Sequence, residues 1–190
     1  MSQNGVLCVY STEQPADAGL LLDRILDYLR PTRIDVVSLQ ANADRSWEQF
    51  QSAEDYDYGS KLLPVPQDRR EIKNYITADR YLYISLLDSP VATRISGAVA
   101  HDIPVAIREL FLPTDPGICI GPHDLFDVDE DDNGFFFGRA FASVQFFGNT
   151  LAPDMKEFTR RLLALPELHA VQQELLPIMG ATKCCMIWSF

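Results

Sequence analysis

The chain has 190 residues, 47% of them hydrophobic and 23% charged, and a formal net charge of −11. This length and composition predict a single globular domain over residues 1–190 with its own hydrophobic core. The negative charge disfavours surface binding to nucleic acid or to anionic lipid, because both present phosphate groups.

The start of the chain predicts a strand, a helix and a second strand in succession. The apolar runs 6–10 and 34–39 are typical of buried strands. Between them, residues 17–30 carry apolar side chains at helical spacing, and Pro31 is expected to end that helix. The apolar face of the helix is predicted to consist of Leu22, Ile25, Leu26 and Leu29.

The segment that follows gives weaker signals. Short helices are predicted over residues 43–50 and 68–77. Between them lies a polar loop that combines carboxylates with tyrosines, and tyrosine often contributes strongly to binding at protein interfaces. The residues of this loop that we consider candidates for binding are Glu54, Asp55, Tyr56, Asp57 and Tyr58.

A second strand-helix-strand unit is predicted in the middle of the chain. Residues 81–87 form an apolar strand, and Ser89 followed by Pro90 is a typical helix start. Residues 104–107 are predicted to return to a strand, which would pair in parallel with the first. The buried face of the intervening helix is predicted from the spacing of Val91, Ile95 and Val99.

The C-terminal part predicts a hairpin, two helices and a last strand. Residues 135–147 are rich in aromatic residues and follow Asn133-Gly134, a dipeptide typical of hairpin turns. A capping pattern predicts a helix over 154–165, and a second helix begins at Pro166, with Pro177 and Gly180 at its end. Residues 183–190 form the last predicted strand. The second helix is expected to bury Leu168, Val171 and Leu175.

These elements predict an α/β or α+β domain. We expect a mixed, mostly parallel central sheet flanked by helices, with a C-terminal portion made of the hairpin, helices and last strand. The alternative organisation divides the chain into β-α-β units over 1–112 and a second part over 113–190.

The acidic charge is concentrated in two segments. Residues 1–60 contain ten acids and four bases, and residues 124–150 contain six acids and one base, while the rest of the chain is neutral. The densest part is the run 124–132, where repulsion between like charges costs stability unless water, a cation or a basic partner compensates it. Its carboxylates belong to Asp124, Asp127, Asp129, Glu130, Asp131 and Asp132.

A metal site is one alternative use of these carboxylates. Residues 129–134 match the first half of a calcium-binding EF-hand loop, but Ala140 stands where the loop needs a bidentate Glu. His101-Asp102 and His123-Asp124 are His-Asp dipeptides of the kind that metal-dependent phosphohydrolases use. The metal ligands in this alternative would be His123, Asp124, Asp127, Asp129 and Asp131.

The remaining residue patterns point away from catalysis. No glycine-rich nucleotide-binding motif is present, so no cofactor is expected. Cys8, Cys184 and Cys185 lie in predicted strands and are expected to be core residues, whereas Cys119, between Gly117 and Gly121, lies in no predicted strand. The first residues, 1–5, lack the basic start and long apolar run of a signal peptide. No apolar run in the sequence is long enough for a helix to cross a membrane. We therefore expect a cytoplasmic protein with reduced thiols and no membrane partner.

The favoured function is that of a non-enzymatic binding protein. Its negative residues, in 124–132 and in 54–58, would block or hold a basic partner protein, as an immunity-type inhibitor of a bacterial nuclease toxin does. A metal-dependent hydrolase is the first alternative, and a structural or assembly subunit that uses the aromatic strand 135–147 is the second. The protein is expected to be a monomer or a homodimer.

Overall fold

The structure is a computed structural model that gives the positions of most of the chain. The residues it describes are 3–11, 13–30, 33–41, 61–63, 80–87, 89–108, 111–113, 116–128, 134–150, 152–180 and 183–189. The two short helices predicted over 43–50 and 68–77, and the polar loop at 54–58, lie outside the described residues.

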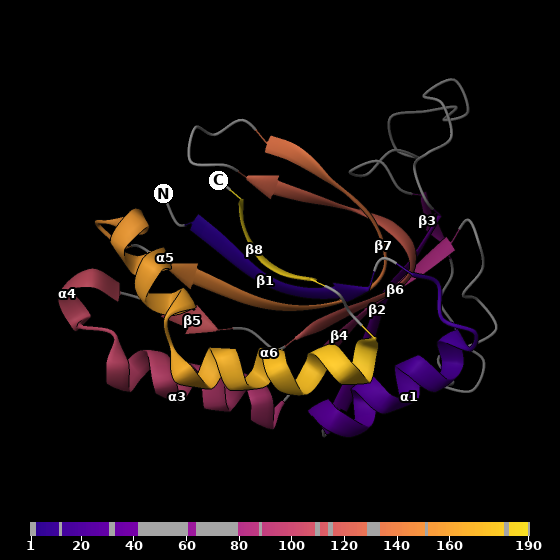
Figure 1. Cartoon of the computed structure of the whole chain (residues 1–190), viewed down its shortest axis with the longest axis horizontal. Helices are drawn as coiled ribbons and strands as arrows, with labels where there is room; N and C mark the ends of the chain where they lie inside the picture. The colour runs from indigo at the N-terminus through magenta and orange to yellow at the C-terminus, as the bar shows by residue number, and fades with distance from the viewer. Residues whose placement is uncertain are drawn as a thin grey trace.

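One antiparallel sheet contains all the described strands (Figure 1). The strand order is β3-β2-β4-β6-β7-β1-β8, and β5 pairs with β7 beside this path. The strands are β1 (Gln3–Ser11), β2 (Arg33–Ala41), β3 (Lys61–Leu63), β4 (Arg80–Leu87), β5 (Phe111–Pro113), β6 (Gly117–Val128), β7 (Gly134–Thr150) and β8 (Lys183–Ser189).

The prediction of a mostly parallel sheet is wrong. Each pairing between described strands is antiparallel. The two strands on either side of the first helix are not neighbours, because β1 pairs with β7 and β8 whereas β2 pairs with β3 and β4. A strand-helix-strand succession therefore does not become a parallel pair here, because each strand finds its partners in a distant part of the chain.

Five described helices accompany the sheet. Figure 1 shows α1, α3 and α6 side by side along one face of it, with α4 and α5 near one end. The helices are α1 (Ala18–Leu29), α3 (Pro90–Asp102), α4 (Val105–Arg108), α5 (Met155–Leu163) and α6 (Pro166–Met179). Their apolar sides and the sheet residues opposite them, including Val9, Ile84 and Val144, form one buried cluster.

The predicted helix starts are confirmed by their capping contacts. Asp17 Oδ1 accepts a hydrogen bond from the Leu20 amide at 2.9 Å, and Asp154 Oδ1 accepts one from the Glu157 amide at 2.9 Å. Ser89 caps α3 in the same way. Each contact satisfies an amide that has no carbonyl partner within the first turn of a helix. The residues predicted to be buried on α1, α3 and α6 are all in the core.

The prediction of a strand at 104–107 is wrong, and the predicted end of α6 is confirmed at Gly180 but not at Pro177. Residues 104–107 do not form a strand, because the Pro104 carbonyl accepts hydrogen bonds from the Ile107 and Arg108 amides and closes the single turn of α4. Helix α6 also continues through Pro177 and ends at Gly180. Gly180 has a φ of 62°, a left-handed conformation that glycine adopts without the steric cost of a Cβ atom.

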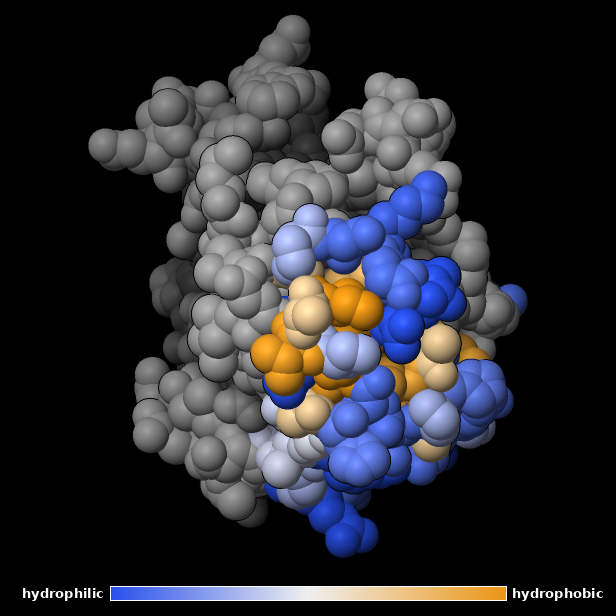
Figure 2. Space-filling view, turned by 90° about the vertical axis from the view of Figure 1, so that its left-hand side faces the viewer, coloured by the Kyte–Doolittle hydropathy of each residue, from blue (hydrophilic) through white to orange (hydrophobic). Residues whose placement is uncertain are grey.

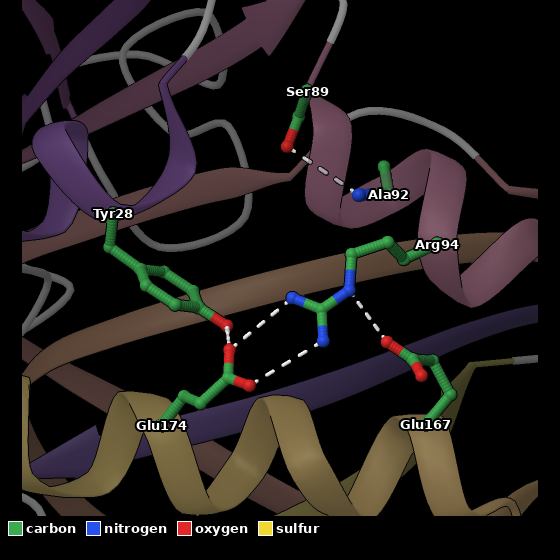
Figure 3. Close-up of polar contacts among 6 residues, drawn as sticks. All are labelled: Tyr28, Ser89, Ala92, Arg94, Glu167 and Glu174. Atoms are coloured by element: carbon green, nitrogen blue, oxygen red, sulfur yellow. Dashed lines mark hydrogen bonds and ion pairs between the residues drawn. The ribbon is translucent and has the colours of Figure 1, made fainter.

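A polar cluster connects the outer sides of α1, α3 and α6 (Figure 3). The Tyr28 hydroxyl donates a hydrogen bond to Glu174 at 2.5 Å, and Arg94 donates to the same carboxylate at 3.3 and 3.5 Å. Arg94 Nε also donates to Glu167 Oε1 at 2.6 Å. The hydrogen bonds from Tyr28 and Arg94 lower the pKa of Glu174. The cluster therefore links three helices that are distant in the sequence.

Replacing Arg94 with alanine is expected to lower the free energy of unfolding by about 0.5–1 kcal/mol, since the pairs are partly exposed and screened by water. Chemical denaturation in urea measures this change. Arg24→Ala is the matched control, because Arg24 is an exposed arginine in the same helical layer. Equal losses in the two variants would contradict a specific role for the cluster.

Candidate functional site

The candidate site is a two-stranded ribbon that continues β6 and β7 beyond the rest of the sheet. β6 pairs with β4 over residues 117–120, and β7 pairs with β1 over residues 142–150. Among the described strands, residues 121–128 and 134–141 pair with each other alone. Figure 1 shows this ribbon curving over the side of the sheet that faces away from the helices. The acidic run 124–132 begins on this ribbon.

A bulge in β6 marks the point where the ribbon leaves the sheet. Ile120 pairs with Ala142 and His123 pairs with Ala140, so Gly121 and Pro122 together stand opposite a single residue of β7. Gly121 has a φ of 117°, which a residue with a side chain rarely adopts. Such bulges bend a strand and redirect its side chains.

His123 is a buried residue next to this bulge. Its ring Nδ1 lies 2.7 Å from the Gly121 carbonyl oxygen, and its Nε2 lies 2.9 Å from Ser143 Oγ. A carbonyl can only accept, so Nδ1 carries the proton, and the neutral Nε2 accepts a hydrogen bond from the Ser143 hydroxyl. The Tyr81 ring lies beside the imidazole, with centroids 5.7 Å apart. His123 therefore joins the bend of β6 to the middle of β7.

The hydrogen-bond network extends further across the sheet. Gln145 Nε2 donates to Ser143 Oγ at 3.1 Å and to Cys119 Sγ at 3.8 Å. Ser143 has no exposed surface, and Cys119 is also buried. Burial raises the pKa of the Cys119 thiol to about 12, so the thiol stays protonated at neutral pH.

The geometry of Ser143 and His123 resembles that of a serine nucleophile with its base, but its burial prevents the same use. A nucleophile must be reached by its substrate, and Ser143 is fully enclosed. The protonated thiol of Cys119 is likewise a poor nucleophile. The network therefore supports a structural role, which is to hold the ribbon at a fixed angle.

Of the metal ligands predicted in the alternative, His123 is the one whose side chain the structure describes. Both ring nitrogens of His123 are hydrogen bonded within the protein, which leaves neither as a metal ligand in this structure. Within the described ranges, no three His, Cys, Asp or Glu residues are grouped closely enough to hold a metal ion. Asp124 and Asp127 lie on β6, opposite Arg139 and Phe135.

The other predicted binding residues are not placed. Asp129, Glu130, Asp131 and Asp132 and the loop residues Glu54, Asp55, Tyr56, Asp57 and Tyr58 lie outside the described residues. The expected hairpin is present, because β6 and β7 are antiparallel and consecutive. Gly134 is already in β7, paired with Val128, so the connection consists of residues 129–133 and not of an Asn133-Gly134 turn.

Ser143 and Gln145 were not predicted as site residues. They alternate with the buried core residues Ala142 and Val144 along β7, so they lie on the opposite face of the sheet. That alternation of polar and apolar residues is visible in the sequence, but their partner His123 comes from a strand that was not predicted. β7 is also central, between β6 and β1, and Phe141 and Phe146 are buried. These two aromatic residues of β7 are therefore not exposed to a neighbouring subunit.

Protonation of His123 is expected to destabilise the fold. Burial lowers the pKa of His123 below its ordinary value near 6.5, although the Gly121 carbonyl partly opposes this shift. Below that ordinary value the unfolded chain binds a proton that the folded protein does not. The contribution of neutral His123 to the free energy of unfolding is thus present at neutral pH. It is lost as the pH falls below about 6.5, by up to ~1.4 kcal/mol per pH unit.

Urea denaturation between pH 7.5 and pH 5 checks this expectation. In His123→Gln, the part of the pH dependence of the free energy of unfolding that is due to this histidine should disappear. His101→Gln and His169→Gln are matched controls, because both side chains are exposed. If the pH dependence of the free energy of unfolding persists in His123→Gln but vanishes in one control, another histidine causes it.

A separate apolar patch lies at the end of the molecule where α4 and α5 are located (Figure 2). Its most exposed large side chains are Val105, at 65%, and Leu163, at 49%. The nearby Arg160 and Arg161 both contact Glu157 at 2.7 Å, so this one carboxylate offsets part of their charge. Nothing on this surface favours a particular type of partner.

Comparison with protein-family models, with curated proteins and with solved structures finds no match to this chain. In the part of the chain that the structure describes, no helix has the length and apolar character needed to cross a bilayer.

Proposed function

We propose that this protein is a cytoplasmic, non-enzymatic binding protein whose acidic run, residues 124–132, blocks or holds a basic partner protein. The observation that supports this proposal is the pairing of the ribbon. Residues 121–128 and 134–141 pair with each other and with none of the other described strands. The described part of the acidic run, up to Val128, therefore lies on a segment of β6 that pairs with β7 alone among the described strands.

The charges of this run favour a cationic partner. Six carboxylates within nine residues repel each other, and a basic surface that approaches them relieves that repulsion. Opposite charges also accelerate association, because attraction acts beyond contact distance at low salt. A nuclease toxin is one partner with the required chemistry, because it must present a cationic groove to its nucleic-acid substrate. An immunity-type inhibitor is thus the concrete form of this proposal.

Preorganisation of the ribbon supports the same function. A binding segment that is held in place loses less conformational entropy on association. His123 donates a hydrogen bond to the Gly121 carbonyl and accepts one from the Ser143 hydroxyl, and these two contacts fix the base of the ribbon. The acidic run 124–132 and the loop 54–58 are the two proposed contacts with the partner.

The proposal predicts that neutralising part of the run weakens partner capture. The variant Asp129→Asn/Asp131→Asn/Asp132→Asn removes three charges and is expected to lower affinity for a basic partner by about tenfold to hundredfold. The immobilised protein is incubated with extract of its own cells, and the captured proteins are identified by mass spectrometry after elution with increasing salt.

The matched control removes three charges elsewhere, at exposed positions, as Glu13→Gln/Asp27→Asn/Asp102→Asn. The control should retain the captured protein at low salt. The proposal fails if both variants lose the protein equally, because net charge alone would then explain binding. It also fails if salt does not release the captured protein from the unmodified chain.

A further inference from the structure

Two cysteines that are distant in the sequence occupy directly opposite positions in neighbouring strands. Cys8 of β1 pairs with Cys185 of β8 in an antiparallel register. Directly opposite residues in such a pair have Cα atoms about 4.5 or 5.5 Å apart, depending on the hydrogen-bonding position. A disulfide forms when the Cα separation is about 4.4–6.8 Å, so this register brings the two residues within bridging range.

We propose that Cys8 and Cys185 form a reversible disulfide that fastens the C-terminal strand to the sheet. A low-molecular-weight disulfide, such as oxidised glutathione, is the oxidant. The thiolate of one cysteine attacks this disulfide, forms a mixed disulfide and releases one glutathione. The thiolate of the other cysteine then attacks the protein sulfur of the mixed disulfide and releases the second glutathione. Two protein thiols are oxidised, one glutathione disulfide is reduced, and the two protons pass to the released thiolates.

The position of β8 gives this bond a physical consequence. β8 is at the end of the strand order, and among the described strands its ladder is with β1 alone. An edge strand held on one side is a part of a sheet that opens at low cost. A bond between Cys8 and Cys185 closes a loop that includes most of the chain, and such long loops restrict the unfolded state most strongly.

The same bond lies next to the network at the base of the ribbon. Cys8 is also directly opposite Gln145 of β7. Gln145 donates a hydrogen bond to Ser143, which in turn contacts His123. Oxidation is therefore expected to stiffen the strand that supports this network.

The other two cysteines do not share this register. Cys184 pairs with Val9, which is a core residue, and successive strand residues alternate between the faces of the sheet. Cys119 is buried in β6 and is paired with Tyr83 and Ser143. Cys184 is thus the matched control for Cys185, because it is the same residue type, one position away in the same strand.

The full chain is incubated with reduced or oxidised glutathione under native conditions, alkylated, digested and mapped by mass spectrometry. In parallel, the melting temperature is measured before and after oxidation. The unmodified chain, Cys184→Ser and Cys119→Ser should each give a linked Cys8–Cys185 peptide. Their melting temperatures should rise by about 5–10 °C on oxidation and return after treatment with dithiothreitol. Cys8→Ser and Cys185→Ser should show neither change.

The proposal is overturned if no Cys8–Cys185 peptide forms in folded protein, or if linkage to Cys184 is equally abundant. It is also overturned if the linked protein melts at the same temperature as the reduced one. Circular dichroism establishes that each serine variant is folded, and Cys8→Ala and Cys185→Ala replace any serine variant that is not. The test does not depend on a bound partner, so its outcome is independent of the proposed function.

Discussion

His123→Ala is expected to lower the free energy of unfolding by about 3 kcal/mol. The substitution removes the donor to the Gly121 carbonyl and the acceptor for the Ser143 hydroxyl, and both groups are buried. A buried polar group that loses its partner costs about 1–3 kcal/mol, and the space left by the ring adds to this cost. Urea denaturation at pH 7.5, where the histidine is neutral, measures the change.

The coupling energy between His123 and Ser143 distinguishes the contribution of their hydrogen bond to stability from the contribution of general packing. Ser143→Ala removes the hydroxyl and leaves the imidazole without that donor. In a double-mutant cycle, the loss for the double variant should be smaller than the sum of the single losses by about 1 kcal/mol or more. Additive losses would contradict direct coupling. The same His123→Ala variant should bind a captured basic partner more weakly, because the ribbon is no longer held at its base.

Phe158→Ala is expected to cost about 3–5 kcal/mol of stability, the largest effect among the substitutions considered. Phe158 is fully buried on α5 and belongs to the main core cluster. Truncation of a buried aromatic ring loses its transfer free energy and leaves a cavity that the surrounding helices fill only in part. Thermal or urea denaturation followed by circular dichroism measures the loss.

Leu163→Ala is the matched control on the same helix. Leu163 is apolar, but 49% of its surface remains exposed at the end of α5. Its truncation should change stability by about 0.5–1 kcal/mol or less, because little apolar area returns to water. A loss as large as that of Phe158→Ala would show that Leu163 is covered in solution, which would identify the patch in Figure 2 as an interface.

The helices could be predicted from the sequence because the interactions that start and end them are local. Asp17, Ser89 and Asp154 each cap a helix by a contact within three residues. The prediction failed at 104–107, where a short apolar run is compatible with either a strand or one helical turn. The aromatic-rich segment 135–147 was also recognised correctly as a strand, which the structure extends to 134–150.

The long strand β6 was missed for an identifiable reason. It contains Gly121, Pro122 and two aspartates, and these residue types are all depleted in strands. The bulge accommodates the first two residues, and pairing with β7 supplies the hydrogen bonds that intrinsic preference alone would not favour. Without β6, the sequence offered no reason to bring His123 and Ser143 together.

The sequence by itself determined α1, α3, α5 and α6, most of the described strands and the concentration of acidic charge in 1–60 and 124–150, since these depend on neighbouring residues or on composition alone. Only the tertiary structure decided the antiparallel strand order, the burial of His123 against Ser143 and the register of Cys8 with Cys185. Each of these depends on pairing between segments far apart in the chain. Such pairing is selected by the packing of the whole sheet against its helices, and local propensity does not encode it.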